Sequence, residues 1–355
     1  MALFSRRKKS DSDDVSVDRP EGVIEPGEQP VDPAADDAAS SESPAAPVPN
    51  VSISTSSFRG VGAPADAAPV TDSTPPVAAR PSARQPGPME APEGLESIPG
   101  LRDNALLATA LAEISGPAEP AQLLNVARQL LQGHVFLRVK GDARALLAEG
   151  KDLPLAIATR GEEQLVLAYS SGQALTKSVE ADGDRDTSAM GQPVMALMRH
   201  VLGGPYAGLV LDHSSGDARA VLPTALLERM VSEADPELRI KTALSEKRTE
   251  STASTVVEAI VAGAPLWIAV NQAEGGPVGV AESRTATGER YLEVFSHPLE
   301  LLALGRGDQA VPLKNEQLAK AILGDDGLTG LLVDPAGPWI RLNRDDLAGL
   351  LALAE

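Results

Sequence analysis

The sequence predicts an α/β (α+β) fold: two tandem copies of a small mixed-sheet-plus-helices domain, preceded by a disordered N-terminal arm. Three observations support this prediction. Helix-like and strand-like patterns follow each other after residue 100, the same order of elements recurs, and the first hundred residues differ in composition from the rest. We therefore expect an arm at 1–100, a first domain at 101–232, a charged helical linker at 233–251 and a second domain at 252–355.

The predicted arm is acidic and rich in proline and alanine. Residues 10–98 hold 16 acidic residues against four arginines and more than half of the 29 prolines of the chain. Such a stretch buries too little apolar surface to offset a backbone entropy cost of roughly 1–2 kcal/mol per residue, so we expect disorder. Residues 51–55 alternate apolar and polar side chains and could add a strand to a sheet edge, although a short apolar patch without structure is the simpler interpretation.

Charge and composition exclude several classes of protein. The net charge of −19 argues against general nucleic-acid binding, and the absence of cysteine excludes disulfides and thiolate metal sites. The basic residues 6–9 are followed at once by acidic ones, so they do not begin a signal peptide, and no apolar run is long enough to span a bilayer. That basic cluster could touch anionic lipid or an acidic partner, but a solvated terminus is the simpler interpretation. We expect a cytoplasmic chain without stable membrane association.

The first domain is expected to contain helices and strands of ordinary length. Apolar periodicity and breaker residues predict the following order of elements. Helices are expected at 104–114, 119–132, 173–179, 194–202 and 224–231, and strands at 135–139, 153–159, 164–169, 208–212 and 219–222.

The second domain repeats this order. Helices are expected at 254–262, 299–304, 313–323 and 345–354, and strands at 266–270, 278–282, 290–295, 330–334 and 339–342. Two residue-level matches support a duplication: residues 207–212 align with 329–334, and residues 167–170 align with 293–296.

The matching segments resemble the SseB (enhanced serine sensitivity) family. Its pattern has an aromatic residue and a hydroxyl-bearing turn before a short helix, and the chain has Tyr169-Ser170-Ser171 and Phe295-Ser296-His297 there. A later Gly-Leu-aliphatic-Asn-Pro-Gly strand end resembles residues 330–337 and, less closely, 208–216. Asp replaces Asn in both copies, and His213 replaces Pro in the first. The resemblance covers about residues 120–355 and implies a fold without established catalytic residues.

These motifs also have a purely structural interpretation. Glycine at a strand start allows close backbone approach, and an aspartate after the strand caps a local turn. The aromatic residue fills the core while the serine that follows it caps the next helix.

No residue pattern indicates an active site or a metal site. The four histidines have no metal-ligand spacing, and each is expected to be a surface or turn residue. Residues 212–215 contain the Asp, His and Ser of a hydrolase triad, but adjacent residues do not easily form one. The glycine pairs 203–204 and 275–276 are expected in turns, and the acidic pairs 325–326 and 345–346 at helix ends. We therefore expect no catalytic, metal or cofactor-binding residues, and ligand-binding residues stay unassigned.

Three functions remain open at this point. The first is a non-catalytic protein-interaction or adaptor protein, in which the duplicated domains form a composite surface for an unidentified protein partner. The second is a small-molecule sensor with a pocket between the copies, lined by Tyr169, Trp267, Phe295 or Trp339. The third and least favoured is a hydrolase that uses His213.

Overall fold

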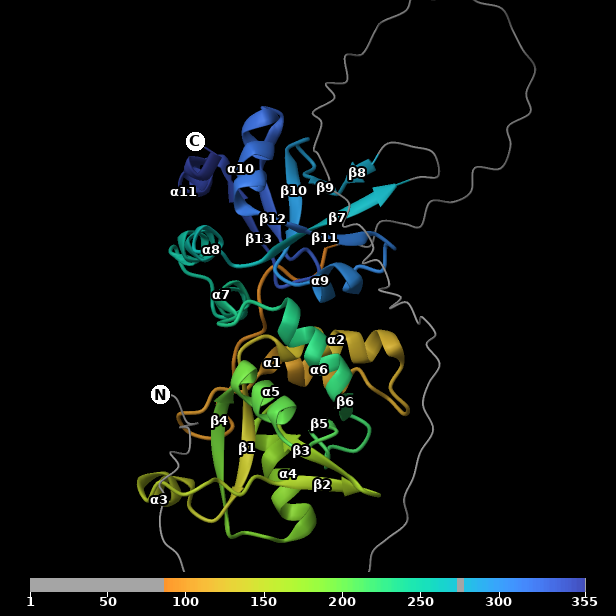
Figure 1. Cartoon of the computed structure of the whole chain (residues 1–355), viewed down its shortest axis with the longest axis vertical. Coiled ribbons are helices and arrows are strands. Elements are labelled where there is room, and N and C mark those ends of the chain that lie inside the picture. The colour runs from red at the N-terminus through yellow and green to blue at the C-terminus, as the bar shows by residue number, and fades with distance from the viewer. Residues whose placement is uncertain (1–85, 273–277, 355) are drawn as a thin grey trace, which may run out of the picture. The chain divides into compact units, whose positions relative to one another are not determined.

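The computed structural model describes residues 86–272 and 278–354 (Figure 1). Helices combine with mixed sheets, so the expected α+β class is confirmed. The predictions for residues 1–85, including the strand-like segment 51–55 and the basic cluster 6–9, lie outside the described residues.

The first half of the described chain contains two helices before its first strand and further helices between the later strands. The helices are α1 (Ala105–Ala112), α2 (Pro120–Leu130), α3 (Ala143–Ala148), α4 (Gly172–Asp182), α5 (Val194–Gly203) and α6 (Thr224–Glu233). The strands are β1 (His134–Lys140), β2 (Ile157–Arg160), β3 (Glu163–Ala168), β4 (Thr187–Pro193), β5 (Gly208–Leu211) and β6 (Ala220–Pro223).

The second half again starts with two helices. The helical elements are α7 (Arg239–Ser245), α8 (Thr252–Val261), α9 (Pro298–Ala303), α10 (Asn315–Gly324), η1 (Arg344–Leu347), α11 (Ala348–Leu351) and η2 (Ala352–Ala354). The strands are β7 (Leu266–Gln272), β8 (Val278–Val280), β9 (Glu282–Arg284), β10 (Arg290–Phe295), β11 (Gln309–Leu313), β12 (Leu328–Val333) and β13 (Ile340–Asn343).

Both halves have the same order of strands. In the first half, β4 pairs with β1, a bridge between Phe136 and Tyr169 joins β1 to the end of β3, and β3 continues through β5 to β6. In the second half the order is β11-β7-β10-β12-β13. β3–β5 and β10–β12 are parallel, and the other pairs along these paths are antiparallel. The tandem-copy prediction requires this order, and a common origin of the halves stays a prediction.

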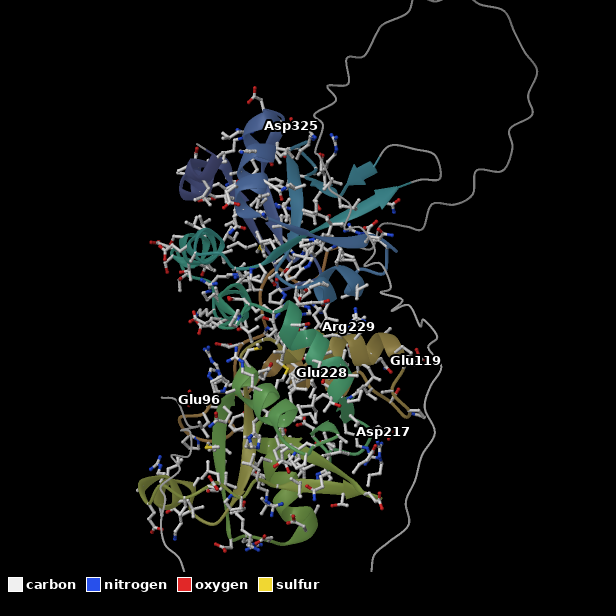
Figure 2. All side chains as sticks on the ribbon, in the orientation of Figure 1. Glu96, Glu119, Asp217, Glu228, Arg229 and Asp325 are labelled. Atoms are coloured by element: carbon white, nitrogen blue, oxygen red, sulfur yellow. The ribbon has the colours of Figure 1, made fainter. Side chains whose placement is uncertain are left out.

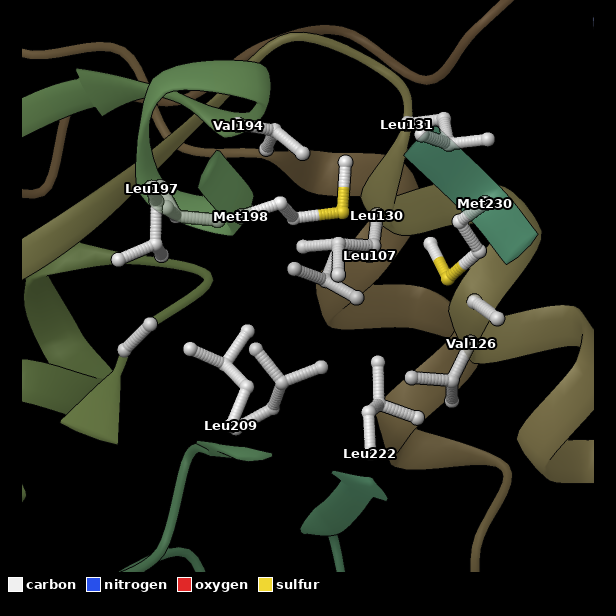
Figure 3. Packing of buried hydrophobic residues seen from close by; sticks show 14 of the residues in the cluster. Leu107, Val126, Leu130, Leu131, Val194, Leu197, Met198, Leu209, Leu222 and Met230 are labelled. Atoms are coloured by element: carbon white, nitrogen blue, oxygen red, sulfur yellow. The ribbon is translucent and has the colours of Figure 1, made fainter. Parts of the chain in front are cut away.

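Each half is built around its own apolar core. In the first half, Leu107 of α1, Leu130 of α2 and Met198 of α5 meet in the middle of the cluster (Figure 3). In the second half, α8, α10 and α11 pack on one face of the sheet, where Ile260, Leu318 and Leu350 are fully buried. Burying a side chain of this size contributes about 1.5–3 kcal/mol, so these clusters hold the helices on the sheets.

Most predicted elements are present, but three were missed. Helix α3 and the edge strands β4 and β11 have no counterpart in the predictions, and Leu313, expected in a helix, ends β11. β4 has the sequence TSAMGQP, without alternation or a β-branched run, so pairing with β1 makes it a strand. The expected last helix at 345–354 is a short α-helix between two 3₁₀ turns, and the expected strand at 278–282 is divided into β8 and β9.

The end of the expected arm is ordered against the folded part. Gly87 donates its N–H to the Pro335 carbonyl at 2.9 Å and accepts the indole N–H of Trp339 at 2.8 Å. Further along, Ile98 lies against Gly172, where a Cβ atom would be 2.4 Å from the Ile98 side chain. Residues 86–100 therefore depart from the expected disorder, because their backbone and side chains have specific partners.

The expected charged linker contains α7, and one side of this helix is buried. Ile240 and Leu244 belong to the core of the second half, and Lys241 is only 2% exposed. This segment is therefore part of the folded body and not only a connector.

Candidate functional site

A serine and an aspartate form the same pair in each half. Asp212 follows β5 and accepts the N–H and the hydroxyl of Ser170, which lies just beyond β3, at 2.7 and 2.5 Å. Asp334 follows β12 and accepts the same two groups of Ser296, just beyond β10, at 2.7 and 2.5 Å. β3 and β5 are parallel neighbours in one sheet, and β10 and β12 are parallel neighbours in the other. The two residues of each pair therefore follow strands that end at the same edge of their sheet.

The geometry of these pairs corrects the expected roles of the motif residues. The aspartates were predicted to cap local turns, but their carboxylates bind a serine about 40 residues away in the chain. The serine after each aromatic residue was predicted to cap a helix, and the following residue does so instead. Ser171 Oγ accepts from the Ala174 N–H at 3.1 Å. The predicted core position of the aromatic residues is confirmed, since Tyr169 and Phe295 are fully buried.

His297 caps the corresponding helix in the second half. Its Nδ1 accepts the N–H of Leu299 at 3.1 Å, and its Nε2 donates to the Met230 carbonyl at 3.2 Å. Of the two positions expected for a histidine, surface or turn, His297 has the second: it is 1% exposed and lies in the turn between β10 and α9. Burial, together with the positive charge of Lys241, lowers the pKa of His297 to about 4.

Four charged side chains are buried together where the two halves meet. The Glu300 carboxylate of α9 accepts from Arg128 of α2 at 3.0 Å and from the ammonium group of Lys241. The same ammonium group lies 3.9 Å from Asp334, and Arg128 also donates to the Gly337 carbonyl at 2.5 Å. We call Arg128, Lys241, Glu300 and Asp334 the buried charge cluster. All four side chains are at most 7% exposed, whereas Glu96, Glu119 and Asp217 lie at the surface (Figure 2).

The charges of the buried charge cluster balance one another. Burial alone would raise the pKa of Glu300, but Lys241 and Arg128 outweigh it and hold this pKa below its ordinary value. Burial raises the pKa of Asp334 to about 6, even though Lys241 acts in the opposite direction. Breaking a buried pair leaves an uncompensated charge, so these side chains fix α2 of the first half against α9 of the second.

A cavity of about 470 Å³ opens beside the start of α1. Asn104 caps this helix by accepting the N–H of Leu107 at 3.0 Å, and its Nδ2 donates to the His134 carbonyl at 3.2 Å. Gln132 lines the cavity and is 3% exposed, yet its Oε1 has no hydrogen-bond partner. A buried amide oxygen without a donor is costly, and this oxygen is not accessible to solvent.

A second hollow of about 500 Å³ lies between α2 and α9. Leu124 of α2 and Leu302 and Leu304 at the end of α9 line it, beside the buried Arg128. Leu302 is 49% exposed, which is high for a leucine next to such a hollow. We call this feature the α2–α9 groove.

The structure does not assemble the hydrolase triad. Ser214 Oγ lies 3.0 Å from His213 Nδ1, but the Asp212 carboxylate binds Ser170 and does not orient the imidazole ring. The predicted aromatic pocket is also wrong in its lining. Tyr169 and Phe295 are fully buried in separate clusters, and the indole N–H of Trp339 is bound to Gly87.

Sequence reasoning missed Arg128, Lys241 and Glu300 of the buried charge cluster, and also Gln132. A weak signal existed for Glu300, which interrupts the apolar run Leu299–Leu302, and for Lys241, which follows the core residue Ile240. Their partners come from distant segments, so local patterns could not identify the cluster.

Comparisons with known proteins leave these sites without a counterpart. No family model, no curated protein and no solved structure matches the chain. Within residues 86–272 and 278–354, no helix is long and apolar enough to cross a membrane. Across the same residues, no group of three or more histidine, aspartate or glutamate side chains could hold a metal ion.

Proposed function

We propose that the chain is a non-catalytic adaptor protein that binds a protein partner in the α2–α9 groove. The observation that carries this proposal is the buried Arg128–Glu300 pair, which fixes the two helices that form the groove. A groove with fixed walls is suited to an amphipathic helix of a partner, whose apolar side chains would cover Leu124 and Leu302.

The chemistry of the buried side chains favours binding over catalysis. Ser170 and Ser296 donate to carboxylates, His297 has both ring nitrogens engaged, and Lys241 binds Glu300. Nucleophiles and bases held this way stabilise the fold and have no free face for a substrate.

A photo-crosslinking amino acid at position 302 of the full-length chain, in cells of its native host, tests the adaptor proposal. Leu323 at the end of α10 is the matched control, because it is 47% exposed against 49% for Leu302 but does not line the groove. We expect one discrete protein adduct from position 302 and none from position 323. Equal labelling from both positions, or none from position 302, would contradict the proposal.

Family, duplication and location are part of the same proposal. The common strand order and the equal serine–aspartate distances support two copies of an SseB-like domain. The acidic, cysteine-free composition supports a cytoplasmic protein without nucleic-acid partners.

Small-molecule binding is the second candidate function, and the cavity of about 470 Å³ beside α1 favours it. Native mass spectrometry of the full-length chain from its host tests it. We expect a small non-covalent adduct that is lost when Ser245, which lines the cavity, is replaced in Ser245→Trp but kept in the exposed control Ser254→Trp. A wild-type chain without an adduct would contradict this function.

A further inference from the structure

The ordered end of the N-terminal arm leads directly to the α2–α9 groove. Gly87 lines the groove, donates its N–H to the Pro335 carbonyl at 2.9 Å and accepts the indole N–H of Trp339 at 2.8 Å. A Cβ atom on Gly87 would lie 2.0 Å from the Ala336 carbonyl oxygen, so the chain passes close to the turn between β12 and β13. The arm therefore joins the folded part at the wall of the groove.

The same turn also contacts α2, which fixes this entry point. The Gly337 carbonyl accepts from Arg128 of α2 at 2.5 Å, and a Cβ atom on Gly337 would lie 2.7 Å from the Pro88 carbonyl oxygen. Arg128 is itself bound to Glu300 of α9. The entry point is thus held by the two helices that form the groove, which lie side by side (Figure 1).

The segment just before the entry point, residues 75–85, is proline-rich, apolar and basic. It lies outside the described residues, and its sequence PPVAARPSARQ contains three prolines, one valine, three alanines and the arginines Arg80 and Arg84. Between Asp72 and Glu90 the chain has no acidic residue, in contrast to the acidic arm as a whole. Proline-rich sequences favour an extended polyproline II conformation, which costs little entropy to fix when it binds an apolar groove.

The α2–α9 groove complements this segment in polarity and in charge. Leu124 and Leu302 contribute to its apolar lining, which suits valine, alanine and proline side chains. Glu113 also lines the groove and is exposed. Its carboxylate accepts from Asn125 at 3.2 Å but forms no ion pair within the described part of the chain. An arginine from the segment would supply the missing cation.

The arm can place an arginine at this carboxylate. The lining residues on α2 run from Gln122 to Arg128, over about 9 Å at about 1.5 Å per residue. Arg84 lies three residues before Gly87, and three extended residues span about 10 Å. The guanidinium group of Arg84 is therefore within reach of Glu113.

Because the connection is short, a weak contact is sufficient for docking. A segment joined this closely to its site has an effective concentration on the order of 1 mM. If the separate peptide bound the groove with a Kd of about 1 mM, the segment would be docked in about half of the molecules. A partner that needs the open groove would then bind with a Kd about twofold higher.

We propose that residues 75–85 dock in the α2–α9 groove and compete there with the protein partner. The docking follows from the chain itself, whereas the role as a competitor rests on the proposed function. The segment and an amphipathic helix of the partner would cover the same side chains, Leu124 and Leu302, so the groove holds one of them at a time.

Photo-crosslinking within the purified full-length chain tests the docking. A photo-crosslinking amino acid at position 302 is irradiated, and proteolysis with mass spectrometry identifies the linked peptide. We expect a link to residues 75–85 in a product with the mass of one chain, and none from the matched control position 323. A product with the mass of two chains, a link to residues 51–55 instead, or no link to the arm would overturn the proposal.

A charge swap tests the ion pair. Arg84→Glu and Glu113→Arg are each expected to lower the crosslink yield about fivefold, because each replaces attraction by repulsion. The two changes combined should restore the yield. Arg59→Glu changes another arginine of the arm and should leave the yield unchanged. A yield that Arg84→Glu does not lower, or that the combination does not restore, would also overturn the docking.

The competition is tested in cells of the native host with the same label at position 302. Arg84→Glu is expected to raise the yield of the partner adduct about twofold, because it frees the groove. An unchanged adduct, with the internal link lost, would overturn the role as a competitor. If no partner adduct formed but the internal link persisted, the proposed function would fail and the docking would stand.

Discussion

The N–H and the hydroxyl group of Ser296 donate to the two carboxylate oxygens of Asp334 at 2.7 and 2.5 Å. Ser170 and Asp212 repeat these distances in the first half. In both halves the pair ties together the ends of two parallel neighbouring strands, and both aspartates have positive φ, 50° and 52°. The motif residues therefore act as long-range structural links.

Ser170→Ala and Ser296→Ala are each expected to lower the free energy of unfolding by about 2 kcal/mol. Each change removes a hydroxyl donor from a buried carboxylate and leaves the backbone N–H in place. Urea unfolding followed by circular dichroism measures the loss. The exposed control Ser254→Ala is expected to stay within about 0.5 kcal/mol of the wild type, and equal losses in all three would refute the assignment.

The stability of Asp212→Asn relative to the wild type is expected to depend on pH. Burial raises the pKa of Asp212 to about 6 from 3.8, so in this range the folded state binds more protons than the unfolded state. Its contribution to stability is complete below pH 4 and is lost as pH rises through 6. The deficit of the variant should therefore shrink by about 2–3 kcal/mol between pH 4 and 7.

His297→Asn is expected to show the opposite trend. The pKa of His297 is lowered to about 4 from 6.5, so its contribution is present above pH 6.5 and is lost as pH falls through 4. The deficit of this variant should shrink toward acid pH. Urea unfolding at pH 4, 5, 6 and 7 measures both variants, and deficits independent of pH would contradict the burial of these groups.

Gly208→Ala and Gly330→Ala are expected to cost about 3 kcal/mol or more, because backbone atoms occupy the space of a side chain. A Cβ atom would lie 2.3 Å from the Leu222 carbonyl oxygen at Gly208 and 1.9 Å from that of Leu342 at Gly330. Gly203→Ala in α5 is the control: nothing lies within 4 Å, and alanine should stabilise the helix by about 0.5 kcal/mol. Thermal unfolding measures all three. If Gly208→Ala and Gly330→Ala did not lower the stability, β5 and β6, and β12 and β13, would not approach each other as closely as described.

Lys241→Met and Glu300→Gln are each expected to cost about 3–5 kcal/mol, because each removes one charge and leaves the remaining buried charges unbalanced. The double variant should cost less than the sum by about 2 kcal/mol, measured by urea unfolding. A double-mutant cycle on the exposed pair Arg160–Glu163, whose charged groups are 2.7 Å apart, is the control. Its coupling energy should be less than about 0.5 kcal/mol. Additive losses at Lys241 and Glu300 would contradict a buried charge cluster.

The sequence predicted local structure better than it predicted contacts. The apolar periodicity was sufficient to predict α1, and the strand expected at 290–295 coincides with β10. β4 and β11 were missed because edge strands without alternation are formed by their neighbours. The motif aspartates were recognised, but their partners were not, since only the parallel pairing of β3 with β5 and of β10 with β12 brings serine and aspartate together.

The buried charge cluster was beyond prediction for a similar reason. Glu300 binds Arg128 across 172 positions of the chain and Lys241 across 59. A charged residue in an apolar run is compatible with a solvated helix face as well as with a buried pair. Only tertiary structure distinguishes these two environments.

We expect the buried charge cluster to join both halves into one folding unit. Both tryptophans, Trp267 and Trp339, lie in the second half, so their fluorescence reports its unfolding alone, whereas circular dichroism reports helices of both halves. In urea the two signals of the wild type should change with coincident midpoints, and Glu300→Gln should separate them. Separate midpoints in the wild-type protein would show that its halves unfold independently and that the cluster does not join them.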